Sequence, residues 1–172
     1  MTRTALFTLC FCLVTPLAAQ ADKNRDLQIL GWLEKVSLEQ ADLVIEAKLD
    51  TGADTSSLHA PELETFERDD EDWVRFTVTN GDGEAYTYEK PISRTVRIRS
   101  ASGRSERYVV EMDICLGGRR ATTEVNLADR GGLSYQMLVG RSFMRDAILV
   151  DSGAKYLAAP DCMSDKAGEN GD

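Results

Sequence analysis

The stretch Leu49-Asp50-Thr51-Gly52-Ala53-Asp54-Thr55-Ser56-Ser57-Leu58 decides the fold of this chain. Apolar and polar residues alternate from Leu43 to Leu49, as in a strand with one buried face. This strand leads Asp50 into a turn of small and hydroxyl-bearing residues. Gly52 permits backbone angles and close approaches that a side chain forbids, and the hydroxyl groups can hydrogen-bond to the turn. On their own, these features favour an ordinary Asx turn without a chemical role.

The rest of the chain has the pattern of an all-β protein. Period-two alternation and short apolar runs predict strands over 43–49, 73–78, 95–99, 108–114, 121–127, 137–139 and 147–150. One short helix is expected near 142–145. Strands spaced so closely favour a barrel or a sandwich.

The first 21 residues have the composition of a secretory signal peptide. Arg3 is their only charged residue, and an apolar stretch over 5–17 is followed by an Ala-x-Ala ending. This stretch is shorter than the roughly 20 apolar residues that a transmembrane helix needs. We therefore expect cleavage after Ala21, a mature domain at 22–163 in the periplasm or outside the cell, and no stable membrane insertion. An uncleaved anchor is the alternative.

Charge and cysteine content bound the mature chain further. Without Arg3, 19 basic residues face 29 acidic ones, a net charge of −10 that disfavours nucleic acid and anionic lipid. Residues 164–172 carry no apolar side chain except Ala167, so we expect a disordered tail. Cys115 and Cys162 can form a disulfide in an oxidising compartment. Two free thiols are an equal alternative, because the sequence does not reveal their geometry.

Two segments of this all-β chain resemble, in the same order, the signatures of retropepsins, which are aspartic peptidases. Leu49 to Asp54 resembles their active-site loop. Met137-Leu138-Val139-Gly140-Arg141-Ser142-Phe143-Met144 resembles the second signature, in which apolar residues precede Gly-Arg and a short helix. Between them, 111–118 resembles the strand and turn that follow the retropepsin flap. The resemblance implies a retropepsin-like closed barrel, with one pepsin-type lobe per chain and an active site completed by dimerisation.

Residues 30–160 resemble more closely a bacterial retropepsin-like group associated with ribosomal-protein glutamate ligases, also labelled ATP-dependent zinc proteases. The similar segments are Gly31-Trp32, 50–60, Ser102-Gly103 and 150–157. Members commonly carry Arg or Lys where this chain has Asp54. Their label also implies zinc and ATP, but His59 is the only histidine, and a zinc site needs three or four protein ligands. Since no phosphate-binding loop is present either, we expect no metal and no cofactor.

The resemblance implies three kinds of site residue. The catalytic loop is Asp50, Thr51 and Gly52. The residues expected to contact substrate are Ala53, Asp54, Ser102, Gly103 and Arg104. The structural residues are Gly140 and Arg141, and we expect a bidentate salt bridge between Arg141 and Asp54 to brace the loop.

The flap, a hairpin that closes over substrate in retropepsins, has two candidates. We favour 100–105, which is rich in small residues. The alternative is the turn at 80–83, which could instead belong to an insertion over about 61–91 that minimal retropepsins lack.

An aspartic peptidase needs two carboxylates that share one proton. Asp151-Ser152-Gly153-Ala154 resembles a second loop, but only 21 residues follow Asp151, too few to build a second lobe. We therefore expect the second carboxylate to be Asp50 of another chain, and a peptide or protein as the substrate.

Two other classes stay open. One is a catalytically silent retropepsin-fold module for peptide binding or regulation, and the other is a metallopeptidase. The association with glutamate ligases implies acidic substrates, which the acidic chain would attract only if basic side chains line the cleft. The candidates are Arg97, Arg99, Arg104 and Arg107.

Overall fold

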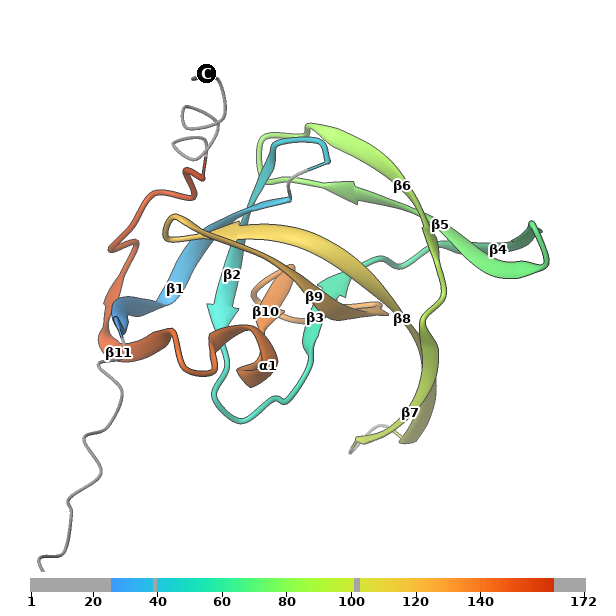
Figure 1. Ribbon diagram of the computed structural model, residues 1–172. Helices are drawn as coiled ribbons and strands as arrows, with labels where there is room; N and C mark the ends of the chain where they lie inside the picture. The colour runs from blue at the N-terminus through green and yellow to red at the C-terminus, as the bar shows by residue number, and fades with distance from the viewer. Residues whose placement is uncertain (1–25, 39, 101–102, 163–172) are drawn as a thin grey trace, which may run out of the picture.

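The computed structural model describes residues 26–38, 40–100 and 103–162. These residues form eleven strands and one four-residue helix (Figure 1). The strands are β1 (Gln28–Leu38), β2 (Leu43–Leu49), β3 (Ser56–His59), β4 (Leu63–Arg68), β5 (Glu71–Thr79), β6 (Ala85–Pro91), β7 (Arg94–Ser100), β8 (Gly103–Leu116), β9 (Arg119–Ala128), β10 (Met137–Val139) and β11 (Ile148–Lys155). The helix α1 spans Arg141–Met144.

Eight of the strands form one sheet that closes into a ring. Their order is β11-β1-β2-β10-β3-β9-β8-β7. β1 also pairs with β8, through Ser37 with Cys115 and Leu38 with Ile114, so β1, β2, β10, β3, β9 and β8 surround one interior. β11 and β7 are left as the two edge strands. The predicted all-β, retropepsin-like fold class is confirmed.

The interior of the ring is the hydrophobic core. In β2, Leu43, Ile45, Ala47 and Leu49 are buried, whereas the residues between them are exposed. The neighbouring strands contribute further aliphatic side chains to the same cluster. Each such side chain stabilises the fold by about 1.5–3 kcal/mol relative to an exposed one. This burial fixes the register of β2, and with it the position of Asp50 at the end of the strand.

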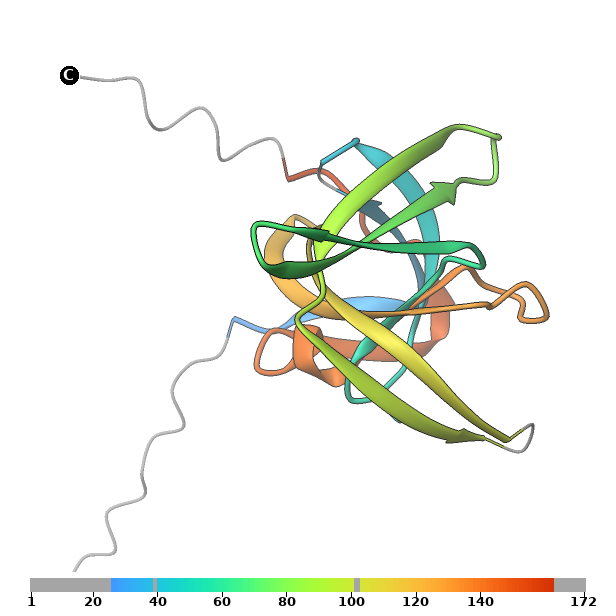
Figure 2. The same cartoon turned by 90° about the vertical axis from the view of Figure 1, so that its right-hand side faces the viewer.

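A second sheet, in the order β4-β5-β6, occupies the expected insertion (Figure 2). Its inner face buries Val74, Phe76 and Tyr88 in the cluster that fills the ring. The turn at 80–83 joins β5 to β6, and there Asn80 Oδ1 accepts hydrogen bonds from the Asp82 and Glu84 amides. This hairpin therefore belongs to the insertion, as the second interpretation of it predicted.

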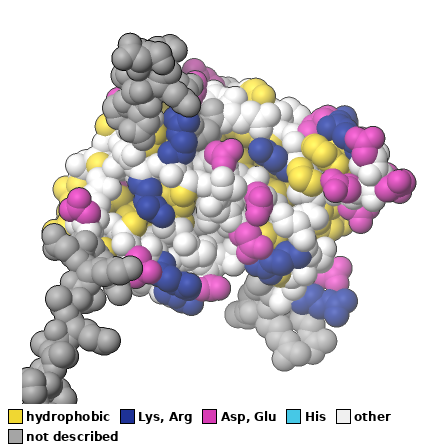
Figure 3. Space-filling view, viewed as in Figure 1, with side chains coloured by type: hydrophobic (Ala, Val, Ile, Leu, Met, Phe, Trp, Pro, Cys, Tyr) yellow, Lys and Arg dark blue, Asp and Glu magenta, His cyan; other side chains and the backbone are white. Residues whose placement is uncertain are grey.

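The outer end of the insertion is a β4–β5 hairpin with mixed chemistry. The Arg68 guanidinium lies 4.4 Å from the centre of the Trp73 ring. Figure 3 shows hydrophobic, basic and acidic side chains gathered on this end of the molecule. Across the rest of that face the charges are interspersed rather than collected into one large patch.

A second hairpin lies where the flap was expected. β7 and β8 pair from Arg94 with Val109 out to Ser100 with Gly103. Of the expected substrate-contacting residues, Ser102 lies outside the described residues, as do the side chains of 98–104.

The C-terminal segment is tied to the ring at two points. Cys115 at the end of β8 forms a disulfide with Cys162, with the two Cα atoms 6.0 Å apart. Glu34 of β1 is fully buried and accepts hydrogen bonds from the Gly31 and Leu157 amides. Of the two alternatives for the cysteines, the structure contains the disulfide.

The structure does not describe either end of the chain, where a signal peptide and a disordered tail were expected. The expected signal peptide falls in 1–25 and the expected tail in 163–172, both outside the described residues. Among the residues that are described, no helix is long and apolar enough to cross a membrane.

Candidate active site

Asp50 is the first residue after β2, and hydrogen bonds fix it at this point. Its amide donates to the Val139 carbonyl across 2.9 Å. Its own carbonyl accepts from the Ala53 amide, and its Oδ1 accepts from the Gly52 amide across 2.9 Å. The turn thus holds one carboxylate oxygen through the backbone, while the other, Oδ2, faces Lys48.

The surroundings of Asp50 favour its ionised form. Partial burial of the side chain acts to raise its pKa. The hydrogen bond from Gly52 and the charge of Lys48, whose Nζ lies 3.4 Å from Oδ2, outweigh this effect and lower the pKa below its usual value. In a single chain this group therefore favours the ionised carboxylate form.

The turn between β10 and α1 braces the loop from below. The Arg141 and Ser142 amides donate to the carbonyls of Ala53 and Asp54, each across 3.0 Å. Arg141 Nη1 donates to the Thr51 carbonyl, and Nη2 pairs with Asp54 Oδ1 at 3.3 Å. The ion pair between Asp54 and Arg141 is therefore present. The expectation that it is bidentate was wrong, because the second nitrogen satisfies the exposed backbone of the loop instead.

Gly140 allows this close contact. A Cβ atom at this position would lie 2.6 Å from the Asp54 carbonyl oxygen, far inside van der Waals contact. The Gly140 amide donates to Ser56 Oγ across 3.1 Å, which ties the same turn to the start of β3. The structural role expected for Gly140 has a direct steric basis.

The sheet beside Asp50 presents a face opposite to the core. Leu58 of β3 and Met137 of β10 are paired and buried in the core, so the alternation of strands puts Ser57 and Leu138 on the other face. Their cross-strand neighbours are Asn126 of β9 and Lys48 of β2. Ser57 Oγ is buried and has no hydrogen-bond partner among the described residues.

Two arginines give this part of the molecule a positive charge. Arg107 Nη1 donates to Asn126 Oδ1 across 3.1 Å. Arg130, only 9% exposed, donates from Nε to the Tyr135 carbonyl. Burial, followed by the repulsion of Arg107, lowers the pKa of Arg130, whereas the charge of Asp50 acts to raise it. The two guanidinium groups and the candidate catalytic carboxylate therefore lie within electrostatic reach of one another.

Sequence reasoning found one of these two arginines. Arg107 was among the expected basic residues, but Arg130 was missed, because it follows β9 in an irregular segment without a periodic pattern. Arg97 instead pairs with Glu106 at 2.8 Å on the exposed hairpin. The side chains of Arg99 and Arg104 lie outside the described residues.

Two further residues that the sequence analysis singled out, His59 and Asp151, lie outside the catalytic loop. His59 Nδ1 accepts a hydrogen bond from the Arg130 amide across 2.8 Å. In the described residues no three His, Cys, Asp or Glu side chains come together as they would around a metal ion. Asp151 Oδ1 accepts from the Gly153 amide, as Asp50 does from Gly52, but this turn lies within edge strand β11, paired with β1.

A ring-shaped all-β sheet, an Asp-Thr-Gly turn at the end of a buried strand and a Gly-Arg turn packed beneath it define a retropepsin-like protein. More narrowly, the chain belongs to the RimB-like family, described as the retropepsin-like aspartic endopeptidase RimB, whose pattern matches residues 29–161.

Curated relatives carry a different description. The chain is 33% identical over 129 residues to a probable alpha-L-glutamate ligase of Desulfotalea psychrophila, and 36% identical over 126 residues to one of Shewanella pealeana. These matches cover 72% and 71% of this chain but only 28% and 26% of the two relatives. The chain thus spans about a quarter of the length of the curated relatives it matches.

A solved structure resembles the chain over most of its length. It is the crystal structure of a Legionella pneumophila protein of unknown function, with a TM-score of 0.66 and 34% sequence identity. The match covers 75% of this chain and 96% of the other.

Proposed function

We propose that the chain is an exported aspartic endopeptidase that hydrolyses peptide bonds with two Asp50 carboxylates, one from each chain of a homodimer. The observation that carries this proposal is the way Asp50 is held. Its Oδ1 is bound by the Gly52 amide, its pKa is lowered, and its loop is fixed from below by Arg141. Membership of an aspartic endopeptidase family supports the same chemistry.

The two carboxylates would act as a pair. At about 3 Å apart they cannot both be ionised, so they share one proton. The ionised partner takes a proton from water as the oxygen attacks the peptide carbonyl, and the protonated partner donates to the carbonyl oxygen. The tetrahedral intermediate then breaks its C–N bond: the carboxyl that took the proton from water gives it to the leaving amine, and the other carboxylate takes back a hydroxyl proton as the C=O bond forms. The pH profile would belong to the pair rather than to either residue.

An apolar surface beside the catalytic loop supports dimerisation. Ile29 and Leu149, 60% and 51% exposed, lie on the paired strands β1 and β11, and Leu27, 38% exposed, directly precedes β1. A groove of about 360 Å³ there is lined by Leu27 and Leu149 and also by Thr51, which follows the catalytic residue. Within the part of the chain that the structure describes, edge strand β11 pairs with β1 alone, so its other side could pair with a second chain. A two-fold contact at this surface would bring the two loops together.

The positive charge near Asp50 supports an acidic substrate. Arg130 is nearly buried, and the positive charge of Arg107 repels its guanidinium group. A carboxylate of the substrate would relieve this repulsion and form charge-assisted hydrogen bonds. The relatives are named as probable alpha-L-glutamate ligases, and glutamate is an acidic residue, which is consistent with this choice of substrate.

Export rests on the N-terminal sequence and agrees with the disulfide. Residues 1–21 have the charge and apolar pattern of a signal peptide. A disulfide such as that between Cys115 and Cys162 persists in oxidising compartments and is rare in the cytosol.

The test is cleavage of a peptide library by the purified protein, read by mass spectrometry from acid to neutral pH. Asp50→Asn and chelator-treated samples run in parallel. We expect cleavage that survives chelation, disappears in Asp50→Asn and favours acidic peptides. Cleavage lost on chelation would indicate a metallopeptidase. Peptide binding without cleavage by a folded dimer would indicate the catalytically silent module.

A further inference from the structure

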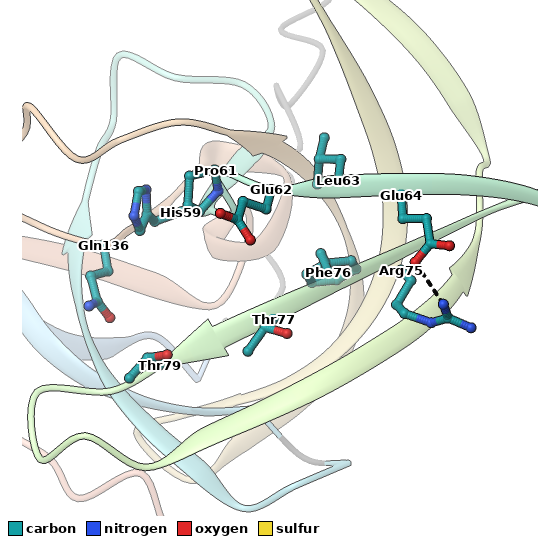
Figure 4. A pocket seen from close by; sticks show the side chains of 10 residues that line it. All are labelled: His59, Pro61, Glu62, Leu63, Glu64, Arg75, Phe76, Thr77, Thr79 and Gln136. Carbon is teal, nitrogen blue, oxygen red and sulfur yellow. Dashed lines mark hydrogen bonds and ion pairs between the residues drawn. The ribbon is translucent and has the colours of Figure 1, made fainter.

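The insertion and β3, the strand that follows the catalytic loop, together line a cavity. The cavity has a volume of about 530 Å³ and lies between β5 and the end of β3 with its link to β4 (Figure 4). Clefts of roughly 300–1,000 Å³ are large enough for a small ligand or a few residues of a peptide. None of the chemistry described above uses this space.

The β5 wall of the cavity offers hydrogen-bonding groups. Val74, Phe76 and Val78 point into the core, so the alternation of the strand turns the intervening side chains the other way. These are Arg75, Thr77 and Thr79, all of which line the cavity. Arg75 is already engaged by Glu64 at 2.7 Å and Glu89 at 2.9 Å, and Thr77 Oγ1 shares a hydrogen bond with Thr87 Oγ1 at 2.9 Å. The Thr79 hydroxyl and the remaining hydrogen-bonding capacity of Thr77 are therefore left to meet a ligand.

The opposite wall comes from β3 and the residue before β10. His59 Nδ1 accepts a hydrogen bond from the Arg130 amide, so in the neutral imidazole Nε2 carries the ring hydrogen. Nε2 can therefore donate a hydrogen bond to a ligand carbonyl. The Gln136 carbonyl accepts from the His59 amide across 2.7 Å, and its side chain lines the cavity. Figure 4 shows His59 and Gln136 side by side on the wall that faces Thr79.

This wall is the same strand face that begins at the catalytic loop. Ser57 and His59 are two residues apart on β3 and therefore share one face, and Leu138 and Gln136 do so on the neighbouring segment. At about 3.3 Å per residue, β3 extends this face over roughly 10 Å from Ser56 to His59. An extended peptide has the same rise, so a peptide that runs parallel to β3 from the loop would reach the cavity with its third or fourth residue.

Charge distinguishes the cavity from the surroundings of Asp50. Glu62 lines the cavity and forms no ion pair among the described residues, whereas Glu64 is neutralised by Arg75. The cavity is therefore anionic overall, in contrast to the cationic pair Arg107 and Arg130. We infer that it is a remote subsite, built by the insertion, which binds a basic residue of the substrate polypeptide. This inference rests on the proposed peptidase function for its choice of ligand.

The test measures binding separately from turnover. Fluorescein-labelled peptides share a glutamate-containing core and carry a six-residue extension on one side or the other, with Lys, Gln or Glu at each extension position. Their affinities are measured by fluorescence anisotropy with the full-length Asp50→Asn protein, alone and combined with Glu62→Lys. The matched control is Glu67→Lys, an exposed glutamate of β4 that does not line the cavity.

We expect one of the two extensions to strengthen binding, with Lys preferred over Glu at a position three or four residues from the core. The preference should be about two- to fivefold, as for a solvent-exposed ion pair. Glu62→Lys should reverse it, and Glu67→Lys should leave it unchanged. The inference is overturned if neither extension adds affinity, or if the two charge reversals act alike. Binding that follows the expected pattern in a protein that cleaves nothing would retain the subsite and remove only the peptidase proposal.

Discussion

At the scale of single residues, the chemistry depends on how Asp50 is surrounded. Backbone and lysine contacts hold one chain's carboxylate in its ionised form, although burial alone would favour the neutral form. A second copy of the same carboxylate would oppose this effect, since two like charges in contact cannot both persist. Each site alone prefers to be ionised. Bringing the two together therefore forces one of the carboxylates to take up a proton, which the pair then shares.

Lys48→Gln tests this balance. Lys48 stabilises the ionised carboxylate, so its loss raises the pKa of Asp50. Because activity on the acid side falls as the ionised partner takes up a proton, the acid limb of the kcat/KM profile should move to higher pH. Lys35→Gln, an exposed lysine on β1, is the control and should leave the profile in place. An acid limb that does not move, or that moves to lower pH, contradicts the role of Lys48.

At the scale of elements, the site depends on the packing of the β10–α1 turn against the catalytic loop. Four backbone and side-chain contacts join the two segments, and they bring Arg141 within reach of both Thr51 and Asp54. The backbones can approach so closely because Gly140 has no side chain. The loop is therefore held by another element rather than by its own turn alone.

Gly140→Ala tests the packing of these two elements. The added methyl group would meet the Asp54 carbonyl at 2.6 Å, so one segment must move. We expect the free energy of unfolding to fall by about 1–3 kcal/mol, as in overpacked sites, and peptide cleavage to fall with it. Urea unfolding and kcat/KM measure the two effects. Gly132→Ala is the matched control, because its added methyl group would meet nothing within 4 Å; equal effects of the two substitutions would contradict the steric explanation.

At the scale of the whole molecule, one chain carries a single Asp-Thr-Gly loop, and an apolar surface lies beside it. Ile29 of β1 and Leu149 of β11 belong to the paired strands that join the first and last described parts of the chain. Assembly at this surface would make the active site a property of the dimer.

Leu149→Arg tests the assembly. A charge at the centre of an apolar contact must be desolvated without a partner, so the protein should dissociate to monomers and lose cleavage activity. Analytical ultracentrifugation measures the mass, and a peptide assay the activity. Val44→Arg, on the exposed side of β2, is the control and should remain dimeric. A Leu149→Arg protein that stays dimeric and active would place the contact elsewhere.

The disulfide is the second feature at this scale. It closes a segment of 47 residues that contains β9, β10, α1 and β11. Replacing both cysteines by alanine should lower the free energy of unfolding by about 2–4 kcal/mol, mainly because the unfolded chain regains freedom. Thermal unfolding with and without dithiothreitol measures this effect. Reduction should destabilise the native protein and leave the variant unchanged; an equally stable variant would contradict the stabilising role.

The sequence by itself determined the strands that have one buried face and the loops that carry local chemistry. The strand before Asp50, the Asp-Thr-Gly turn, the Gly-Arg turn with α1 and the insertion all follow from residues close together in the chain. Alternation is a local signal because only one face of these strands is buried. β1, β3, β4 and β6 were not among the predicted strands. β1 is buried along most of its length between β2, β8 and β11 and therefore shows no such alternation.

Only the tertiary structure decided which distant residues meet. The approach of Arg130 to Asp50 and Arg107, the disulfide and the cavity beside His59 join segments dozens of residues apart in sequence. The closure of the ring through β1 and β8 likewise joins the two halves of the chain. Such contacts depend on the register of whole strands, which is set by the sum of core burial rather than by any local pattern.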